Sequence, residues 1–236
     1  TTAQQQEIAA QMLTAAMTRK PGKAAIKLVP DGAGAGQTAL VIINDDMPFI
    51  IDSLTSEVVR RGLQVDLLLH PILNVARDKA AMSDIATRIV AAGMQAESHV
   101  YIRFDHQLPQ NEADALVAGI AEVMEDVRLA TSDWRAMLAQ IHRILNDEGA
   151  DNSATPADRL EARAFLTYLY ENNFTFLGYR AYKFVEKTDR IVSKAVADSS
   201  LGILKKAGKI YFDDDNGAPE AEALAQRYVA DIKTSA

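Results

Sequence analysis

The chain has 236 residues, of which 48% are hydrophobic and 24% charged, and its formal net charge is −7. This composition is that of a folded globular protein and excludes intrinsic disorder. The negative charge opposes binding to phosphate backbones, so nucleic acid is not an expected partner. No apolar run approaches the ~18 residues of a membrane span, so no membrane partner is expected either. The sequence has no cysteine, which excludes disulfides and a cysteine nucleophile and suits the cytoplasm.

The N-terminal part of the chain predicts one helix and two strands. The opening Thr1-Thr2-Ala3 has neither Met nor a signal leader, so we expect a piece of a longer protein. Apolar residues at helical spacing predict a helix over 4–20, which Pro21-Gly22 ends. The apolar runs Ala24–Val29 and Thr38–Ile43 predict two strands joined by a glycine-rich hairpin loop.

A second helix is expected directly after the strand at Thr38–Ile43. Asp45 or Asp46 would supply its N-cap, and Pro48 would lie in its first turn, where a missing N–H costs nothing. Gly62 is suited to the left-handed conformation that follows a helix. The apolar stripe of this helix consists of Ile50, Ile51, Leu54, Val58 and Val59.

Two further strand regions and a long helical region follow. The run Leu63–Leu69 predicts a strand that bends at His70-Pro71 and continues through Ile72–Arg77. The segment His99–Asp105 alternates apolar and polar residues, which is typical of a strand with one face in solvent, and such a strand at an edge could pair with another chain. A helical stripe then runs from Leu116 to Leu145, and the sequence leaves open whether it is interrupted at residues 131–133.

The C-terminal part of the chain predicts a second folded unit. Residues 149–156 are rich in Gly, Asn, Ser and Pro, as expected for a linker. Thr155-Pro156-Ala157-Asp158 has the form of a capping box, so we expect a helix there. The strand-like runs beyond it are Phe174–Val185, Ile191–Ala197, Ile210–Phe212 and Tyr228–Lys233.

The familiar catalytic and cofactor motifs do not fit this sequence. Gly32-Ala33-Gly34-Ala35-Gly36 lacks the third glycine of a dinucleotide fingerprint and precedes a strand. The acidic run 213–215 fails the calcium-loop spacing, because Phe212 would be the first ligand. The four histidines have no zinc-binding spacing, and no G-x-S-x-G elbow occurs. We therefore assign no catalytic residue and no metal site.

The remaining candidate site is the turn from the strand at Thr38–Ile43 into the second helix. A helix N-terminus has free amide N–H groups and attracts anions, and the carboxylates of Asp45 and Asp46 could meet an ammonium group. A zwitterionic amino acid carries both charges. The simpler alternative is that an aspartate only caps the helix. The candidate ligand-binding residues are Asn44, Asp45, Asp46, Met47 and Phe49.

Several short and uncommon sequence segments resemble those of one known family. The order strand, helix, strand, strand, helix over 38–127 is similar to an ACT regulatory domain, whose pattern is βαββαβ. Four segments resemble the N-terminal region of the large bacterial NAD-specific glutamate dehydrogenases. They are Asn44–Ser53, Arg60-Arg61-Gly62-Leu63, Leu69–Leu73 and Phe174–Arg180. The chain departs from the ACT pattern in two ways. First, Phe49 stands where the family usually has a glycine, and its side chain fills space that a ligand would use. Second, no fourth strand follows Val127, so the strand at Ala24–Val29 is a candidate for the sheet edge that this fourth strand would occupy.

The resemblance implies an α+β fold with an ACT-like (ferredoxin-like) βαββα sheet domain and extra helices. It divides the chain into an N-terminal helix (1–23), an ACT-like domain with a long C-terminal helix (24–148), a linker (149–156) and a partial second α+β domain (157–236), for which an ACT-like fold is one option. It also implies a cytoplasmic, homo-oligomeric parent enzyme that oxidises L-glutamate to 2-oxoglutarate and ammonia with NAD. The catalytic lysine and the NAD-binding domain of the family lie far downstream, so we expect no cofactor in this chain.

Two functions remain open at this point. The first is a regulatory region that senses an amino-acid effector at Asp45–Phe49. The second is a structural module that positions the rest of the parent chain or other subunits and binds no small molecule. An independent enzyme has no set of residues to support it.

Overall fold

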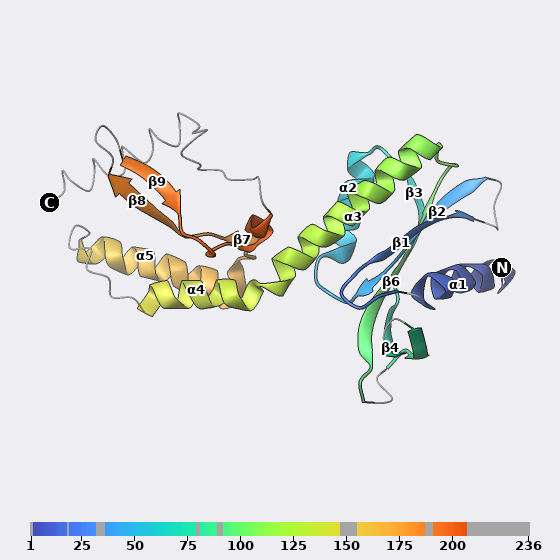
Figure 1. Cartoon of the computed structure of the whole chain (residues 1–236), viewed down its shortest axis with the longest axis horizontal. Coiled ribbons are helices and arrows are strands. Elements are labelled where there is room, and N and C mark those ends of the chain that lie inside the picture. Colours follow the sequence, from blue (N-terminus) through green and yellow to red (C-terminus); the bar gives the residue numbers. More distant parts are fainter. Residues whose placement is uncertain are drawn as a thin grey trace. The chain divides into compact units, whose positions relative to one another are not determined.

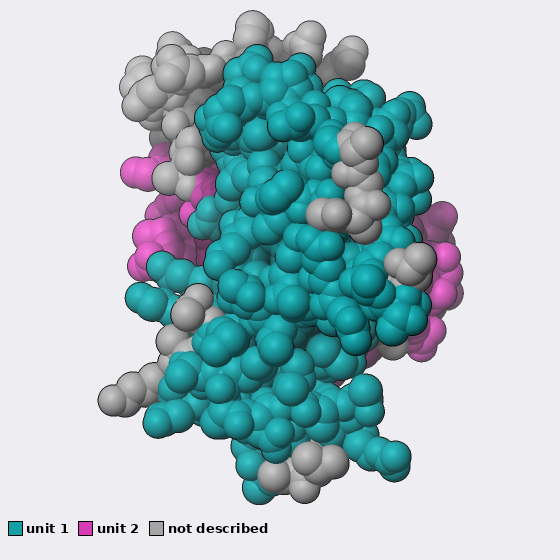
Figure 2. Space-filling model, turned by 90° about the vertical axis from the view of Figure 1, so that its right-hand side faces the viewer, with its two compact units in different colours: residues 1–128 teal, residues 129–236 magenta. Residues whose placement is uncertain are grey.

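The computed structural model describes residues 2–17, 19–31, 36–78, 81–88, 92–146, 155–186 and 191–206. The chain divides into two compact units, residues 1–128 and 129–236, which Figure 2 shows in different colours. The finer division expected from the sequence, with boundaries at 23, 148 and 156, stays a prediction. Most of the expected linker lies outside the described residues, as do the strand-like runs Ile210–Phe212 and Tyr228–Lys233 and the acidic run 213–215.

An antiparallel sheet forms the centre of unit 1 (Figure 1). The strand order is β1-β2-β6-β4-β5, and β3 also pairs with β6. Every adjacent pair is antiparallel. The strands are β1 (Ala25–Asp31), β2 (Gln37–Asp45), β3 (Val65–Leu69), β4 (Ile72–Asp78), β5 (Ala81–Ala86) and β6 (Gln95–Phe104).

The order of elements in unit 1 confirms an α+β, ferredoxin-like fold. The series β2, α2, β3, β6, α3 reproduces the expected βαββα order. The edge beside β2 is occupied by β1, which pairs with β2 from Ala25↔Ile43 to Asp31↔Gln37. The segment before β2 thus supplies the strand that the sequence lacks after the second helix.

The predicted strand regions on either side of His70-Pro71 are β3 and β4, and both pair with β6. β3 lies along the C-terminal part of β6, with Leu69 opposite Tyr101, and β4 lies along its N-terminal part, with Ile72 opposite Ser98. The bend therefore lets two short strands share one long partner. Because β6 has strands on both sides, it is central, and the expectation that His99–Asp105 lies at an edge is wrong.

Two helices cover one face of this sheet. Both α2 (Ile50–Arg60) and α3 (Gln110–Ser132) present apolar residues at helical spacing to the strands. Gly62 follows α2 with φ 72°, the left-handed conformation expected there. The buried cluster on this face contains Leu40, Ile42, Ile50, Leu54, Val58, Val100, Ile102, Phe104, Leu108, Ala113, Leu116, Ile120 and Met124.

A third helix covers the opposite face, where the sequence analysis expected solvent. α1 (Thr2–Met17) places Ile8, Met12, Ala15 and Ala16 against the other side of β2 and β6. Tyr101 is consequently fully buried, and His99 is only 2% exposed. The prediction of one wet face on β6 is therefore wrong. Alternation identifies the two faces of a strand, but it cannot show that a distant helix covers the polar one.

Unit 2 begins in the last turn of α3 and contains two more helices and short strands. α4 (Trp134–Asn146) starts one residue after α3 ends, so the helical region is interrupted at Asp133. α5 (Pro156–Tyr168) has the predicted capping box of Thr155 and Asp158 and runs into η1 (Leu169–Asn173). The remaining elements are β7 (Gly178–Tyr179), β8 (Tyr182–Glu186), β9 (Ile191–Ala195), β10 (Leu201–Gly202) and η2 (Ile203–Lys205). In the described part of the chain, no helix is long and apolar enough to cross a membrane.

The packing of α2 makes a direct test of this fold possible. Leu54→Ala removes a side chain with 0% exposure and should lower the free energy of unfolding by about 2–5 kcal/mol, since it leaves a cavity under α2. Val59→Ala on the same helix, at 70% exposure, should change it by less than about 0.5 kcal/mol. Urea unfolding of both variants measures the difference, and equal losses would contradict the described orientation of α2.

Candidate functional site

The end of β2 and the loop that joins it to α2 hold all five candidate residues. β2 ends at Asp45, and α2 begins only at Ile50. Phe49 is the residue before the helix, and it has a left-handed backbone with φ 69° and ψ 7°. No side chain caps this helix, so the expectation that Asp45 or Asp46 does so is wrong. The helix starts several residues later than expected, and both carboxylates accept hydrogen bonds from other elements.

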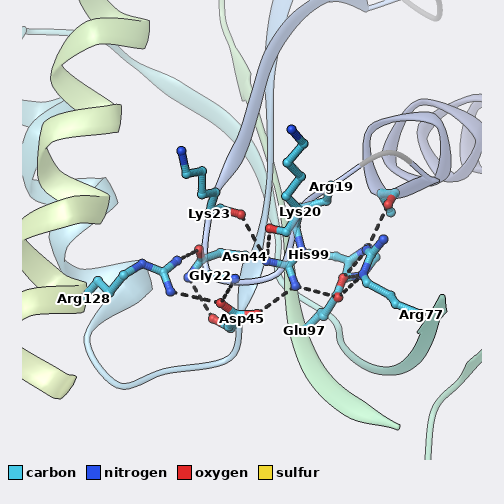
Figure 3. A network of polar contacts seen from close by, with 11 residues as sticks. Arg19, Lys20, Gly22, Lys23, Asn44, Asp45, Arg77, Glu97, His99 and Arg128 are labelled. Atoms are coloured by element: carbon cyan, nitrogen blue, oxygen red, sulfur yellow. Dashed lines mark hydrogen bonds and ion pairs between the residues drawn. The ribbon is translucent and has the colours of Figure 1, made fainter. Parts of the chain in front are cut away.

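The carboxylate of Asp45 is held by two arginines from different parts of unit 1 (Figure 3). Its Oδ1 accepts from Arg19 Nη2 at 2.7 Å, and its Oδ2 accepts from Arg128 Nη1 and from the Gly22 N–H, each at 3.0 Å. Arg128 Nη2 also donates to Oδ1 of the buried Asn44 at 2.5 Å. Asn44 and Asp45 therefore hold the loop to α3 and to the segment that follows α1.

A second carboxylate, Glu97 on β6, extends this cluster beneath the end of α1. Glu97 Oε1 accepts from Arg19 Nη2 at 2.7 Å and from Arg77 Nε at 2.6 Å. Arg77 Nη2 donates to Glu97 Oε2 at 2.7 Å and to the Ala16 carbonyl at 2.9 Å. The Ala16 carbonyl, at the C-terminal end of α1, also accepts from the Arg19 N–H at 3.3 Å, so Arg77 is its second donor. We call Arg19, Asp45, Arg77, Glu97 and Arg128 the charged cluster.

The arginines determine the ionisation of both acids in the charged cluster. Burial by itself would raise the pKa of Glu97, but hydrogen bonds from Arg77 and Arg19 outweigh it and hold that pKa below its ordinary value. The pKa of Asp45 is lowered in the same way, by Arg19 and Arg128 against burial. Both groups therefore stay ionised at neutral pH and keep the guanidinium groups paired.

His99 lies beside the charged cluster and is neutral. Its Nε2 is 3.8 Å from Glu97 Oε2 and has no hydrogen-bond partner among the described residues. Burial lowers the pKa of His99 from 6.5 to about 4, although Glu97 opposes this shift; the nearby Arg77 and Arg19 add to it. A neutral imidazole is the form that this site favours.

Asp46 belongs to a separate chain of polar groups on the α2 side of the sheet. Ser98 Oγ donates to Asp46 Oδ1 at 2.6 Å, and His70 Nε2 lies 3.0 Å from the same Oγ. Since the single hydroxyl proton goes to Asp46, Ser98 accepts from His70. The serine is in the middle, whereas an acyl-transfer triad has histidine between serine and acid. This arrangement of the three residues therefore does not activate Ser98 as a nucleophile.

Met47 and Phe49 supply the apolar part of the loop. Met47 packs against the core cluster under α2, and the Phe49 side chain is 44% exposed. Of the five candidates, Asp46 and Phe49 are therefore at the surface, while Asn44 is buried and Asp45 is bonded by the arginines. No group of three or more potential metal-ligating side chains occurs within the described ranges.

No motif or periodic pattern in the sequence points to Arg19, Arg77, Glu97 or Arg128 as functional residues. Strand alternation does place Glu97 on the same face of β6 as His99 and Tyr101, and an acid beside two such residues is a weak signal of a buried polar site. The arginine partners lie 20 to 83 residues from Glu97 and Asp45, so their contacts depend on the tertiary fold.

Removing the carboxylate of Glu97 tests the strength of the charged cluster. Glu97→Gln leaves two buried guanidinium groups without their shared counter-ion and should cost about 3–5 kcal/mol of unfolding free energy. Asp66→Asn removes a carboxylate from a more exposed pair with Arg103 and should cost at most about 1 kcal/mol. Both values come from urea unfolding at neutral pH, and a Glu97→Gln loss as small as that of Asp66→Asn would refute a stabilising role.

The lowered pKa of His99 predicts loss of stability in mild acid. Between pH 7 and pH 5 the unfolded chain takes up a proton at this histidine, but the folded chain, with a pKa of about 4, does not. The unfolding free energy should therefore fall by about 2 kcal/mol from this group alone. His99→Gln should abolish that part of the decrease, while His106→Gln, at an exposed histidine beyond the other end of β6, should leave it intact. A decrease that persists in His99→Gln would assign the pH dependence to other groups.

Comparison with known proteins gives the family. The family model described as "Glutamate dehydrogenase, ACT1 domain" matches residues 3–120. The NAD-specific glutamate dehydrogenase of Halomonas elongata is 34% identical over 172 residues, which cover 71% of this chain and 11% of that enzyme. The enzyme of the same name from Pseudomonas aeruginosa is 32% identical over 176 residues, covering 72% of this chain and again 11% of the relative. The chain thus spans about a ninth of the length of these relatives, and it belongs to the glutamate dehydrogenase ACT1-domain family.

Proposed function

We propose that this chain is a non-catalytic regulatory region of an NAD-dependent glutamate dehydrogenase, which converts L-glutamate to 2-oxoglutarate and ammonia. The ACT1 family match and the names of both relatives support this assignment. The acids of the charged cluster are paired with arginines, and Ser98 donates its proton to Asp46, so these groups are poor candidates for acid–base or nucleophilic chemistry. In this proposal NAD and the catalytic lysine belong to other parts of a cytoplasmic, homo-oligomeric parent enzyme.

The regulatory signal in this proposal is an amino acid bound at the 44–49 loop. The observation that carries it is the start of α2, which has no side-chain cap and lies four residues after the exposed Asp46. The backbone amides of the first turn would receive the ligand carboxylate, and Asp46 would receive its ammonium group. Phe49 offers an aromatic surface to the ligand side chain, and Met47 supports the loop from the core. Asn44 and Asp45 hold the loop in place.

A thermal-shift panel of the twenty amino acids at millimolar concentration tests this proposal. A ligand at ~100 times its Kd should stabilise the chain by roughly 2.7 kcal/mol. For a chain of this size that is about 5–11 °C in Tm. Asp46→Asn should remove most of the shift, because it deletes the charge that meets the ammonium group.

The matched control for Asp46→Asn is Asp105→Asn, which removes an exposed carboxylate just beyond the other end of β6. This variant should keep the full shift. A panel in which no amino acid raises Tm would contradict sensing by this chain, and an equal loss of the shift in both variants would contradict the role given to Asp46.

A structural role in assembly is the second candidate, and unit 2 provides the observation that favours it. α5 has no buried residue, and its large apolar side chains Leu160, Phe165 and Tyr168 are 71%, 61% and 55% exposed. Exposed apolar side chains of this size are typical of surfaces that contact other polypeptide. The partners would be the rest of the parent chain or other subunits. Light scattering that finds only monomers at every concentration would contradict self-assembly through this surface.

A further inference from the structure

Arg128 ties the end of β2 to α3. Its two terminal nitrogens donate to two consecutive residues at the end of β2, Nη2 to Asn44 Oδ1 and Nη1 to Asp45 Oδ2. The guanidinium group is planar and rigid, so both bonds form together only when the two acceptors keep their relative positions. A change in the backbone where β2 enters the loop must therefore move Arg128 or break one of these bonds.

Asp45 cannot shift independently of Arg128, because its other contacts fix it as well. Its Oδ1 accepts from Arg19, which is itself bonded to the buried Glu97, and its Oδ2 also accepts from the Gly22 N–H. Figure 3 shows Arg128 reaching Asp45 from the α3 side and Arg19 reaching it from the side of α1. The end of β2 is thus held from two directions, and Arg128 is the contact that belongs to α3.

The last turn of α3 connects this contact to unit 2. Arg128 is the final residue of unit 1, and α3 continues to Ser132. The next residue, Asp133, accepts from the Gly202 N–H at 2.8 Å and from Lys205 Nζ at 2.7 Å, both within unit 2. These bonds hold the pKa of Asp133 below its ordinary value. The last turn of α3 therefore lies between two charged residues. Arg128 before it is bonded within unit 1, and Asp133 after it is bonded within unit 2.

We propose that Arg128 is a relay, which transmits the conformation of the 44–49 loop through the last turn of α3 to Asp133 and unit 2. The proposal rests on the function proposed above, because an amino acid at this loop supplies the signal. A ligand held by Asp46 and the start of α2 contacts a residue that is adjacent to Asp45 in the chain, so a shift of Asp46 is passed to Asp45. The guanidinium group of Arg128 then either moves with the loop or loses its hydrogen bond to Asn44 or Asp45. Either response changes the stability of the helical turn that ends at Ser132.

The chain contains its own reporter for this turn. Trp134 is the single tryptophan of the sequence, it is the first residue of α4, and it is 47% exposed. Intrinsic tryptophan fluorescence therefore reports only on the junction that follows α3. Amide hydrogen exchange over residues 129–133 gives an independent second readout of the same turn.

The first arm of the experiment uses the full chain without ligand. Arg128→Gln and Asp45→Asn should each shift the Trp134 emission and accelerate exchange over 129–133 by about tenfold, the order expected for loss of one charge-assisted hydrogen bond. The double variant should be no faster than the single ones, because both remove the same contact. Arg128→Lys keeps the positive charge but has only one terminal nitrogen, so its effect on the emission and on the exchange rate should be intermediate.

The controls separate a relay from general destabilisation. Arg60→Gln removes an exposed arginine of α2 and should change neither readout. Exchange at the central amides of β2, Leu40 to Ile43, should stay at the wild-type rate in every variant, which shows that unit 1 remains folded. Unchanged readouts in Arg128→Gln, or effects of the two single variants that add in the double variant, would overturn the proposal.

The second arm adds each of the twenty L-amino acids at millimolar concentration. An amino acid that raises Tm and shifts Trp134 emission in the wild type, but raises Tm without shifting the emission in Arg128→Gln, supports the relay. An amino acid that raises Tm and leaves the wild-type emission unchanged overturns the relay while sensing stands. If no amino acid raises Tm, the proposed sensing function fails, and the ligand-free arm alone decides whether Arg128 couples the loop to α3.

Discussion

The ion pair between Arg19 and Glu97 is the interaction on which the rest of unit 1 depends. Both side chains are almost completely buried, and their 2.7 Å contact joins the segment after α1 to the central strand β6. A buried charge without a partner costs several kcal/mol, so neither residue can be placed there alone. Arg77 and Asp45 complete the pairing, and through them the same contact fixes the end of α1 and the end of β2.

This arrangement explains why a sheet of ferredoxin-like order has helices on both of its faces. α1 buries only four residues, and two of them are alanines, so apolar contact contributes modestly to its attachment. The Arg77 side chain adds a hydrogen bond to the Ala16 carbonyl, and Arg19 comes two residues after the end of α1. Buried ion pairs are weak sources of net stability, but they select one arrangement of the groups they join. The charged cluster therefore contributes mainly to the specificity with which α1, β2 and α3 meet.

The sequence was sufficient to predict most of the local structure of unit 1, but not which distant residues contact each other. Apolar periodicity predicted β2, α2 and the bent pair β3 and β4, because these depend on residues close together in the chain. It misplaced the start of α2, since an aspartate before a helix looks like a cap whether or not its carboxylate is bonded elsewhere. It also assigned the polar face of β6 to solvent, because that face is covered by α1, which is far from β6 in the sequence. Asp45 was a candidate from the sequence, but Glu97 and the arginines that bind both acids were not.

Phe49 combines a bulky side chain with a left-handed backbone conformation. A bulky side chain at φ 69° is strained, and this conformation is the one that a glycine would adopt without cost. The strain persists only if the surrounding structure fixes both ends of the loop. Here Asp45 is fixed by Arg19 and Arg128, and α2 is fixed by its buried stripe. The turn thus accommodates a bulky residue, whose ring is 44% exposed. If the loop binds an amino acid, that ring is placed to contact its side chain, so Phe49 would affect which amino acid fits more than whether the turn forms.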